Sequence, residues 1–304
     1  MKGLVIKSTG LWYEVNVDGE RKVARLRGRF KLEDKKITNP IAVGDWVDIS
    51  PNNQVENEWV IEDILPRENY VIRKSPRKRN YDHLIASNID QGVLIATLKM
   101  PRTSIGFIDR FLISLEAFRI PGIVLFNKSD LYKKSDLALF EELKTIYEKI
   151  GYHIMLTSFT TGPTDALYAL FEGKRSLLSG HSGSGKSTLV NRLLPAAMQA
   201  VSEVSSFANK GVHTTTFAEM FHINDTTSII DTPGIKELGL SEIDDVEISH
   251  YFPEMRDFLG KCKFHNCLHD NEPGCVVKEN VGNSISIRRY DSYLSILRGD
   301  DNRK

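Results

Sequence analysis

The pattern of apolar and polar residues changes along the chain, and its first part is typical of β-structure. Residues 1–66 contain short strand-like runs such as Trp12–Val17 and Trp46–Ile49. Asp18-Gly19 follows the first of these runs and indicates a hairpin turn. Several short strands in so short a segment predict a small closed barrel such as an OB-fold. The runs themselves predict strands. That the strands close into a barrel is inferred only from how many of them there are.

Beyond residue 90 the apolar runs become continuous. Gly92–Thr97, Gly122–Phe126 and His153–Thr157 are such runs, which fit strands buried on both faces of a parallel sheet. Apolar residues recur at helical spacing from Phe140 to Ile150, and Gly151 then indicates a helix end. This alternation of β and α segments predicts a doubly wound α/β domain.

The segment between these regions is basic. Arg73–Arg79 holds five lysines and arginines in seven residues. It is either a solvated tether or, beside an OB-fold, a contact for a nucleic-acid phosphate backbone, and we favour the second interpretation.

One motif fits the phosphate-binding loop G-x-x-x-x-G-K-[ST]. Its residues, with the one that follows, are Gly180, His181, Ser182, Gly183, Ser184, Gly185, Lys186, Ser187 and Thr188. A strand-like run precedes it and a helical segment follows, which argues against a chance glycine-rich loop. Such a loop turns backbone N–H groups toward phosphate oxygens. Lys186 would contact the β- and γ-phosphates, and the Ser187 hydroxyl would bind Mg²⁺.

A second motif, N-K-x-D, is typical of guanine recognition. It comprises Asn127, Lys128, Ser129 and Asp130 and follows a buried strand. The Asp130 carboxylate can accept from guanine N1–H and the N2 amine, whereas adenine offers neither donor there. The alternative is a surface turn, which the position at a strand end disfavours. Thr157 and Ser158, after the next strand, are candidates for a loop that supports the base.

The third motif is D-x-x-G, from Asp231 to Gly234. Asp231 would hold Mg²⁺ through water, and the Gly234 N–H would contact the γ-phosphate. A Pro-Gly turn after an edge strand is the alternative. Thr215, in the intervening segment Lys210–Thr216, is the candidate switch I ligand of Mg²⁺.

These motifs stand in an unusual order, because N-K-x-D precedes the phosphate-binding loop by 53 residues. The ends of the strands build such a site, whatever their order along the chain. The order is that of a circularly permuted GTPase. The segment after Gly234 then leads directly into the C-terminal domain, so movement there on hydrolysis could reach that domain.

The residue after D-x-x-G departs from Ras-like enzymes. Ile235 stands where a glutamine usually orients water, so intrinsic hydrolysis should be slow unless another group serves. His213 is the nearest candidate by sequence for a catalytic role. The alternative for His213 is a solvent-facing loop residue.

The three cysteines of the chain lie close together near its end. Cys262, Cys267 and Cys275, with His269, provide the four ligands of a closed tetrahedral Zn²⁺ site of structural type. His265 lies between them and is a competing ligand. In a reducing compartment disulfides are disfavoured, so the alternative to a metal site is three free thiols.

The charge balance and the absence of long apolar runs restrict the possible partners. Lysine and arginine total 40 against 40 acidic residues, so no global field indicates a nucleic acid or a membrane as partner. No run of 18 apolar residues occurs, and the N-terminus lacks a signal-peptide core. We expect a cytoplasmic monomer with no membrane partner.

We therefore expect a multidomain α/β protein in four parts. They are an OB-fold-like RNA-binding domain (1–66), a basic linker (67–80), a circularly permuted P-loop GTPase domain (81–240) and a C-terminal helical zinc-binding domain (241–304).

Together the β-rich start, the permuted motifs and the Cys/His cluster resemble one family, the ribosome-small-subunit-dependent GTPases (RsgA/YjeQ). Gly211–Thr216 is similar to its G-x-H-T-T-T switch I, and Lys261–Cys275 resembles its zinc loop. The resemblance implies GTP hydrolysis, through GTP and GDP states, coupled to late maturation of the small ribosomal subunit. It also implies contacts of the OB-fold and zinc domain with 16S rRNA, and a water-positioning role for His213.

Two other functions remain open at this point. A P-loop kinase or ATPase would need a phosphate-acceptor pocket, which the sequence does not indicate. A GTP-gated RNA-binding scaffold with negligible turnover is compatible with Ile235.

Overall fold

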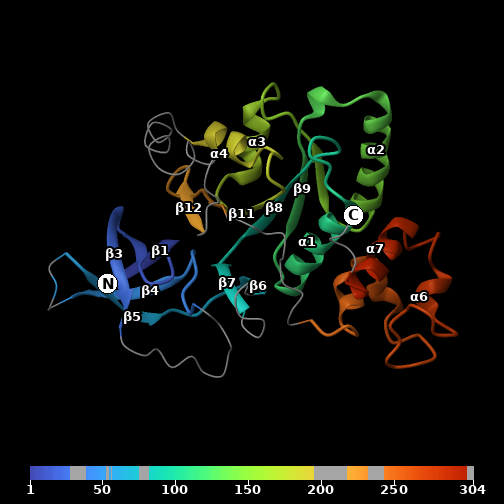
Figure 1. Cartoon of the computed structure of the whole chain (residues 1–304), viewed down its shortest axis with the longest axis horizontal. Coiled ribbons are helices and arrows are strands. Elements are labelled where there is room, and N and C mark those ends of the chain that lie inside the picture. Colours follow the sequence, from blue (N-terminus) through green and yellow to red (C-terminus); the bar gives the residue numbers. More distant parts are fainter. Residues whose placement is uncertain are drawn as a thin grey trace. The chain divides into compact units, whose positions relative to one another are not determined.

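The computed structural model describes residues 1–27, 39–52, 55, 57–74, 82–194, 218–231 and 243–299. Contacts divide the chain into two units. The first comprises residues 1–93, 159–179 and 185–237, and the second comprises residues 94–158, 180–184 and 238–304. Figure 1 colours the elements along the chain.

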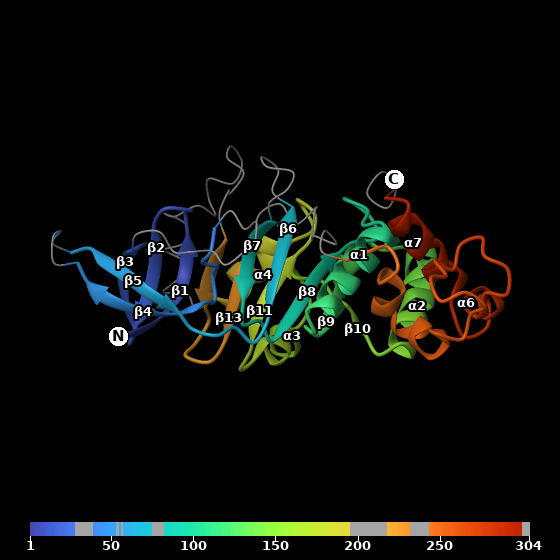
Figure 2. The same cartoon turned by 90° about the horizontal axis from the view of Figure 1, so that it is seen from below.

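Five N-terminal strands of the first unit form a closed barrel. They are β1 (Lys2–Ser8), β2 (Tyr13–Val17), β3 (Glu20–Leu26), β4 (Trp46–Pro51) and β5 (Trp59–Ile64). Their order is β1-β2-β3-β5-β4, and β4 pairs back with β1 (Figure 2). Only the β3–β5 pair is parallel among these pairings. Val5, Val15 and Ile61 fill the interior. The predicted OB-fold is confirmed.

The predicted hairpin joins β2 to β3. Val17 pairs with Glu20, and the two residues between them, Asp18 and Gly19, have φ angles of 51° and 89°. Two consecutive positive φ angles match the twist of the flanking strands, which explains the Asp-Gly sequence.

Beyond the barrel, the described part of the first unit includes three strands and two helices from later in the chain. They are α3 (Thr164–Phe171), β11 (Arg175–Ser179), α4 (Lys186–Leu193), β12 (Glu219–His222) and β13 (Ser228–Asp231). β11 and β13 are parallel, and β12 pairs with β13 antiparallel. β12 also meets the barrel at the pair Lys7–Glu219, whose side chains form an ion pair of 3.2 Å.

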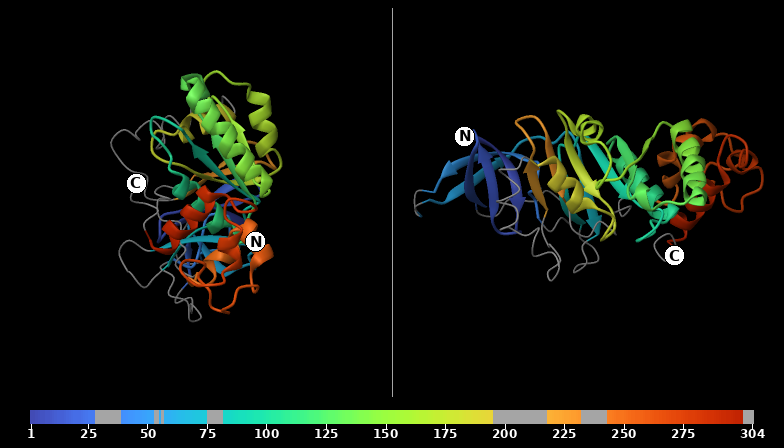
Figure 3. Two further views of the ribbon diagram at one scale, coloured as in Figure 1. Left: turned by 90° about the vertical axis from the view of Figure 1, so that its right-hand side faces the viewer. Right: turned by 90° about the horizontal axis from the view of Figure 1, so that it is seen from above.

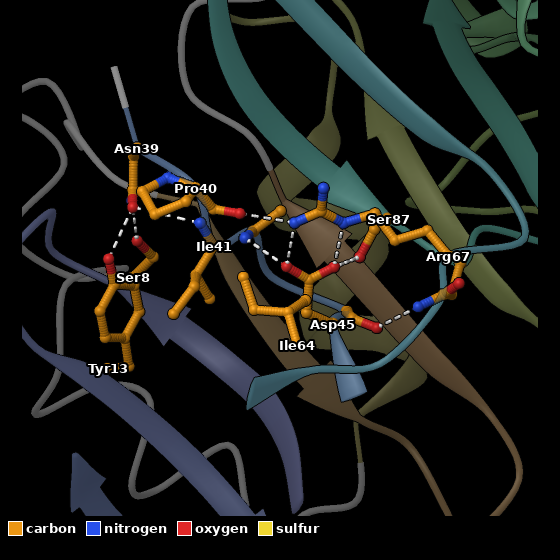
Figure 4. A network of polar contacts seen from close by, with 12 residues as sticks. Ser8, Tyr13, Asn39, Pro40, Ile41, Asp45, Ile64, Arg67 and Ser87 are labelled. Carbon is orange, nitrogen blue, oxygen red and sulfur yellow. Dashed lines mark hydrogen bonds and ion pairs between the residues drawn. The ribbon is translucent and has the colours of Figure 1, made fainter. Parts of the chain in front are cut away.

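A fully buried carboxylate holds the barrel to the segments that follow it. Asp45 accepts two hydrogen bonds from the Arg67 guanidinium, both of 2.7 Å, one from the Ser87 hydroxyl at 2.5 Å and one from the Ala42 N–H at 2.8 Å (Figure 4). At the preceding Gly44, with φ of +99°, a Cβ would lie 2.1 Å from the Ser87 carbonyl oxygen. Only glycine therefore allows the close approach that completes this network.

The beginning of the expected basic linker is ordered structure, not a tether. β6 (Tyr70–Lys74) pairs antiparallel with β7 (Asp82–Ser87), and Arg67 binds Asp45. The strand was missed because the basic residues that follow Ile72 indicated a linker, whereas Val71 and Ile72 are buried in β6. Residues 75–81, with most of the Arg73–Arg79 cluster, lie outside the described residues.

The second unit contains the rest of the α/β region. β8 (Gln91–Ala96) crosses the boundary between the units. Then follow α1 (Ile105–Ala117), β9 (Gly122–Phe126), η1 (Ser129–Leu131), α2 (Lys134–Lys149) and β10 (His153–Leu156). The strand order is β10-β9-β8, with β9 and β10 parallel. The predicted helix end is confirmed, since α2 stops just before Gly151, where φ is +91°.

The C-terminal segment of the second unit is helical, as expected. It comprises η3 (Ile248–Tyr251), η4 (Pro253–Phe258), α6 (Val276–Glu279) and α7 (Ile287–Leu297). Phe252, Met255 and Tyr293 form its core together with Ile113 of α1. α7 thus lies beside α1 and α2 (Figure 3). Among the described residues no helix is long and apolar enough to cross a membrane.

The Asp45 network leads to a test of barrel stability. Replacing Asp45 by alanine leaves the half-buried Arg67 without its partner, so we expect a loss of about 3–5 kcal/mol in the free energy of unfolding. All three tryptophans lie between residues 12 and 59, so their fluorescence in a denaturant titration reports on the barrel. Glu20→Ala, which removes the exposed pair with Lys22 of the same barrel, is the matched control and should change little. Equal effects of the two variants would contradict a special role for Asp45.

Candidate guanine-nucleotide site and metal centre

The phosphate-binding loop, Gly180–Ser187, joins β11 to α4 and depends on its glycines. At Gly180, with φ of +146°, a Cβ would lie 2.5 Å from the Ile95 carbonyl oxygen. Gly183 and Gly185 have φ angles of +80° and +111°. All three conformations disfavour a side chain, and together they bend the chain so that its N–H groups can converge on an anion. Lys186 and Ser187 are the first residues of α4.

Asn127 joins the guanine motif to this loop. Its side chain is 3% exposed, and its Nδ2 donates to the Ser184 carbonyl oxygen at 2.9 Å. Its own backbone N–H donates to the Ala96 carbonyl oxygen at the end of β8. Two motifs that are far apart in the sequence are therefore directly bonded.

Asp130 and the two residues after β10 also come together. The Ser158 hydroxyl donates to Asp130 Oδ1 at 2.7 Å, and the Ser129 N–H donates to the Thr157 carbonyl oxygen at 3.0 Å. One oxygen of the carboxylate is therefore held by Ser158, which fixes its orientation. Thr157 and Ser158, the candidates for a loop that supports the base, therefore lie beside the guanine motif.

The segment from Thr97 to Ser104 was not singled out from the sequence, yet it borders both motifs. The Lys128 ammonium donates to the Met100 carbonyl oxygen, and Pro101 Cδ lies 3.7 Å from where a Cβ on Gly183 would be. A usable signal existed, since this segment follows β8 at the carboxyl end of a parallel sheet, where ligands bind.

Asp231 ends β13. It is 7% exposed and pairs across the strands with Leu178 of β11, two residues before the phosphate-binding loop begins. The remaining predicted residues of the site, His213, Thr215 and Gly234, lie outside the described residues, as does Ile235.

The four predicted metal ligands lie together in the C-terminal segment. The ligand atoms of Cys262, Cys267, His269 and Cys275 all fall within 4.8 Å of one another. Cys262 Sγ is 3.9 Å from Cys275 Sγ. Zn–S bonds of about 2.3 Å in a tetrahedron separate two sulfurs by about 3.8 Å, so the cluster fits this ion. His265 is exposed and does not belong to the group.

The surroundings of the cluster suit a metal. Burial lowers the pKa of His269, which keeps its imidazole in the neutral form that binds metals. Burial also raises the pKa of Cys267 to about 12, so a free thiolate is disfavoured there unless a cation is present. Tyr290 and Tyr293 donate to the carbonyl oxygens of His269 and Leu268, both at 2.6 Å, and hold the ligand loop against α7.

Comparison with known proteins gives a consistent result over the whole chain. The model of the RsgA GTPase family matches residues 64–241, and that of the RsgA N-terminal domain matches residues 2–57. The small ribosomal subunit biogenesis GTPase RsgA of Cytophaga hutchinsonii is 53% identical over 300 residues, which cover 98% of each chain. The protein of the same name from Bacteroides fragilis is 46% identical over 307 residues, covering 100% of this chain and 98% of the relative.

Two solved structures are similar along the whole chain. YjeQ from Thermotoga maritima superposes with a TM-score of 0.74 and 33% identity, covering 100% of this chain and 99% of that one. YloQ, described as a circularly permuted GTPase, superposes with a TM-score of 0.70 and 27% identity, covering 100% and 96%.

The cluster geometry predicts which residues matter for metal binding. Cys267→Ser removes one of four ligands, so the purified variant should lose its bound metal, whereas His265→Ala should retain it. Metal content by mass spectrometry checks both, with about one Zn²⁺ per wild-type chain expected. Wild-type protein without zinc, or retention of zinc by Cys267→Ser, would contradict this ligand set.

Proposed function

Because the chain belongs to the RsgA GTPase family and is therefore a GTP hydrolase, we propose that it acts on the small ribosomal subunit. It binds the subunit in its GTP state and couples hydrolysis to late subunit maturation. The observation that carries the nucleotide assignment is the Asn127–Ser184 hydrogen bond, which holds the guanine motif at the phosphate-binding loop. Its cellular location is the cytoplasm, where it works as a monomer.

Guanine selectivity comes from Asp130 in this proposal. The carboxylate accepts from N1–H and the N2 amine of the base, while Ser158 holds one of its oxygens. The stem of Lys128 covers the face of the base, and Asn127, Ser129 and Thr157 complete the walls. Adenine offers no donors to this carboxylate, so it would lose both hydrogen bonds and with them affinity.

The phosphates bind along the loop from Gly180 to Thr188. Backbone N–H groups and Lys186 would neutralise them, and Ser187, Thr215 and Asp231 would hold Mg²⁺. When bound, Mg²⁺ stabilises negative charge that develops on the phosphate oxygens. The Gly234 N–H contacts the γ-phosphate, so that the segment leading to the C-terminus responds to its loss.

Water is positioned by His213 in this scheme. A neutral imidazole accepts a hydrogen bond from the attacking water and aligns it with the γ-phosphate. The apolar side chain of Ile235 cannot hydrogen-bond to water, and this is why we assign the role to His213. We infer that the ribosomal subunit places His213 and so raises a slow intrinsic rate.

RNA contacts complete the proposal. The barrel and the C-terminal segment bind 16S rRNA, and the Zn²⁺ held by Cys262, Cys267, His269 and Cys275 has a structural role there. The basic cluster Arg73–Arg79 supports the same assignment, since phosphate contacts require lysine and arginine.

Nucleotide choice provides one test. In Asp130→Asn the two guanine donors lose their acceptor, so GDP affinity should fall by at least tenfold while affinity for xanthosine diphosphate rises. Equilibrium titration with both nucleotides checks this. Asp225→Asn, in an exposed turn outside all nucleotide motifs, is the control. Unchanged selectivity in Asp130→Asn, or equal binding of ADP and GDP by the wild type, would refute the assignment.

Turnover with purified small subunits provides the second test. We expect wild-type GTP hydrolysis to rise with subunit concentration and His213→Ala to lose this stimulation while it retains GTP affinity and subunit binding. Thr215→Ala should lower both hydrolysis and GTP-dependent docking. Full stimulation of His213→Ala would reject the histidine. No stimulation of the wild type would favour a GTP-gated scaffold.

A further inference from the structure

Helix α1 carries two buried contacts on opposite faces. The Phe107 ring stacks on the ring of His181 in the phosphate-binding loop, with centroids 4.2 Å apart and planes 31° from parallel. Asp109 comes two residues later, which on a helix is a rotation of about 200°. Its side chain is fully buried and faces α7 and α2. The helix is therefore held between the loop and the C-terminal segment.

The contact on the second face is a buried charge cluster. Arg289 of α7 is 1% exposed and pairs with Asp109 and with Glu254 of η4. Its guanidinium donates twice to Glu254, at 2.6 and 3.1 Å, and the Tyr147 hydroxyl donates to Asp109 at 2.5 Å. Four elements, α1, α2, η4 and α7, thus meet at one cation.

The position of the Arg289 guanidinium is closely fixed by its neighbours. The Arg289 guanidinium lies over the rings of Phe252 and Tyr147, at 4.6 and 5.4 Å from their centroids. Burial raises the pKa of the Asp109 carboxyl, and the charge of Arg289 opposes that effect. Because an unpaired buried charge is costly, α7 cannot shift without taking Asp109, and hence α1, with it.

The start of α1 is also tied to the guanine motif. The Ser104 hydroxyl caps the helix by accepting from the Phe107 N–H at 3.2 Å. The preceding loop is closed by the Thr103 N–H, which donates to the Thr97 carbonyl oxygen at 2.8 Å. Within that loop the Met100 carbonyl accepts from Lys128. A displacement of α1 would therefore shift residues in contact with both the N-K-x-D motif and the phosphate-binding loop.

We propose that Arg289 and Asp109 are positioning residues for the nucleotide site, and that α1 transmits the docking of the C-terminal segment to the phosphate-binding loop through Phe107 and His181. The inference rests on the proposed function for what the loop binds. A contact that shifts α7, such as RNA on the C-terminal segment, changes nucleotide affinity. By linkage, nucleotide binding changes the affinity of that segment for its partner by the same factor.

A double-mutant cycle in the full chain tests the path. Asp109→Asn keeps the shape of the side chain but weakens the pair with Arg289, and Phe107→Leu removes the ring contact with His181. Each should speed amide hydrogen exchange of residues 180–184 in nucleotide-free protein and weaken GDP binding, both by about tenfold. The double variant should be no worse than the more affected single variant, because the two changes interrupt one path.

Matched variants separate this path from general destabilisation. Arg288→Gln removes the neighbouring pair of α7 with Glu142, whose side chains are 45% and 47% exposed, and should leave both readouts unchanged. If Asp109→Asn does not fold, Tyr147→Phe, which removes one hydrogen bond to the same carboxylate, should shift both readouts in the same direction by a smaller factor.

Two outcomes would overturn the proposal. One is additive effects in the double variant. The other is faster exchange in α7 of Asp109→Asn, or of Tyr147→Phe where that variant replaces it, with residues 180–184 and GDP affinity unchanged. A wild type that binds no guanine nucleotide would refute the proposed function alone, because hydrogen exchange of the loop still decides whether α1 transmits the change.

Discussion

The hydrogen bond from the Asn127 amide to the Ser184 carbonyl is the contact on which the proposed nucleotide site depends. Asn127 directly follows β9, and Ser184 lies in the loop between β11 and α4. The bond is buried, so losing it would cost more free energy than losing a hydrogen bond at the surface. It ties Asn127, and with it the N-K-x-D motif, to residues 180–184, and Asp130 and Ser158 are joined by their own bond.

This constraint also explains why a permuted order of motifs is tolerated. Nothing in the Asn127–Ser184 contact requires that either motif come first along the chain. What it requires is that the loops leave their strands at one end of the sheet, and parallel strands meet this condition in any order. The permutation has a mechanical consequence, since the D-x-x-G motif then leads into the C-terminal segment. α1 offers a second route to that segment, through Phe107 on one face and Asp109 on the other.

Local patterns predicted much of this fold. Continuous apolar runs gave β8, β9 and β10, the Asp18-Gly19 pair gave a hairpin, and the spacing of three cysteines with His269 gave a cluster whose geometry fits Zn²⁺. In each case the pattern lies within a short stretch of the chain. The residues that form the strand, the turn or the metal cluster are close together in the sequence. Strand-end reasoning also singled out Thr157-Ser158 as a loop that supports the base, and Ser158 bonds to Asp130 in the structure.

Two of the unpredicted features are buried or half-buried ion pairs whose partners are distant in sequence. Arg67 was assigned to the basic linker, but it pairs with Asp45, and Arg289, which the sequence did not single out, pairs with Asp109 and Glu254. A charged residue gives no local sign that it will be buried, because burial depends on a partner whose position only the fold determines. His213, Thr215 and Gly234 remain predictions from sequence, since they lie outside the described residues.

The central claim is that motifs in permuted order form one guanine-nucleotide site around Asn127. A crystal structure of the chain with GDP and Mg²⁺ tests it most directly. The account predicts the base paired with the Asp130 carboxylate, the phosphates on the N–H groups of the loop from Gly180 to Ser187, and the Asn127–Ser184 bond retained. A nucleotide bound with its base away from Asp130, or with the phosphates outside that loop, would contradict it.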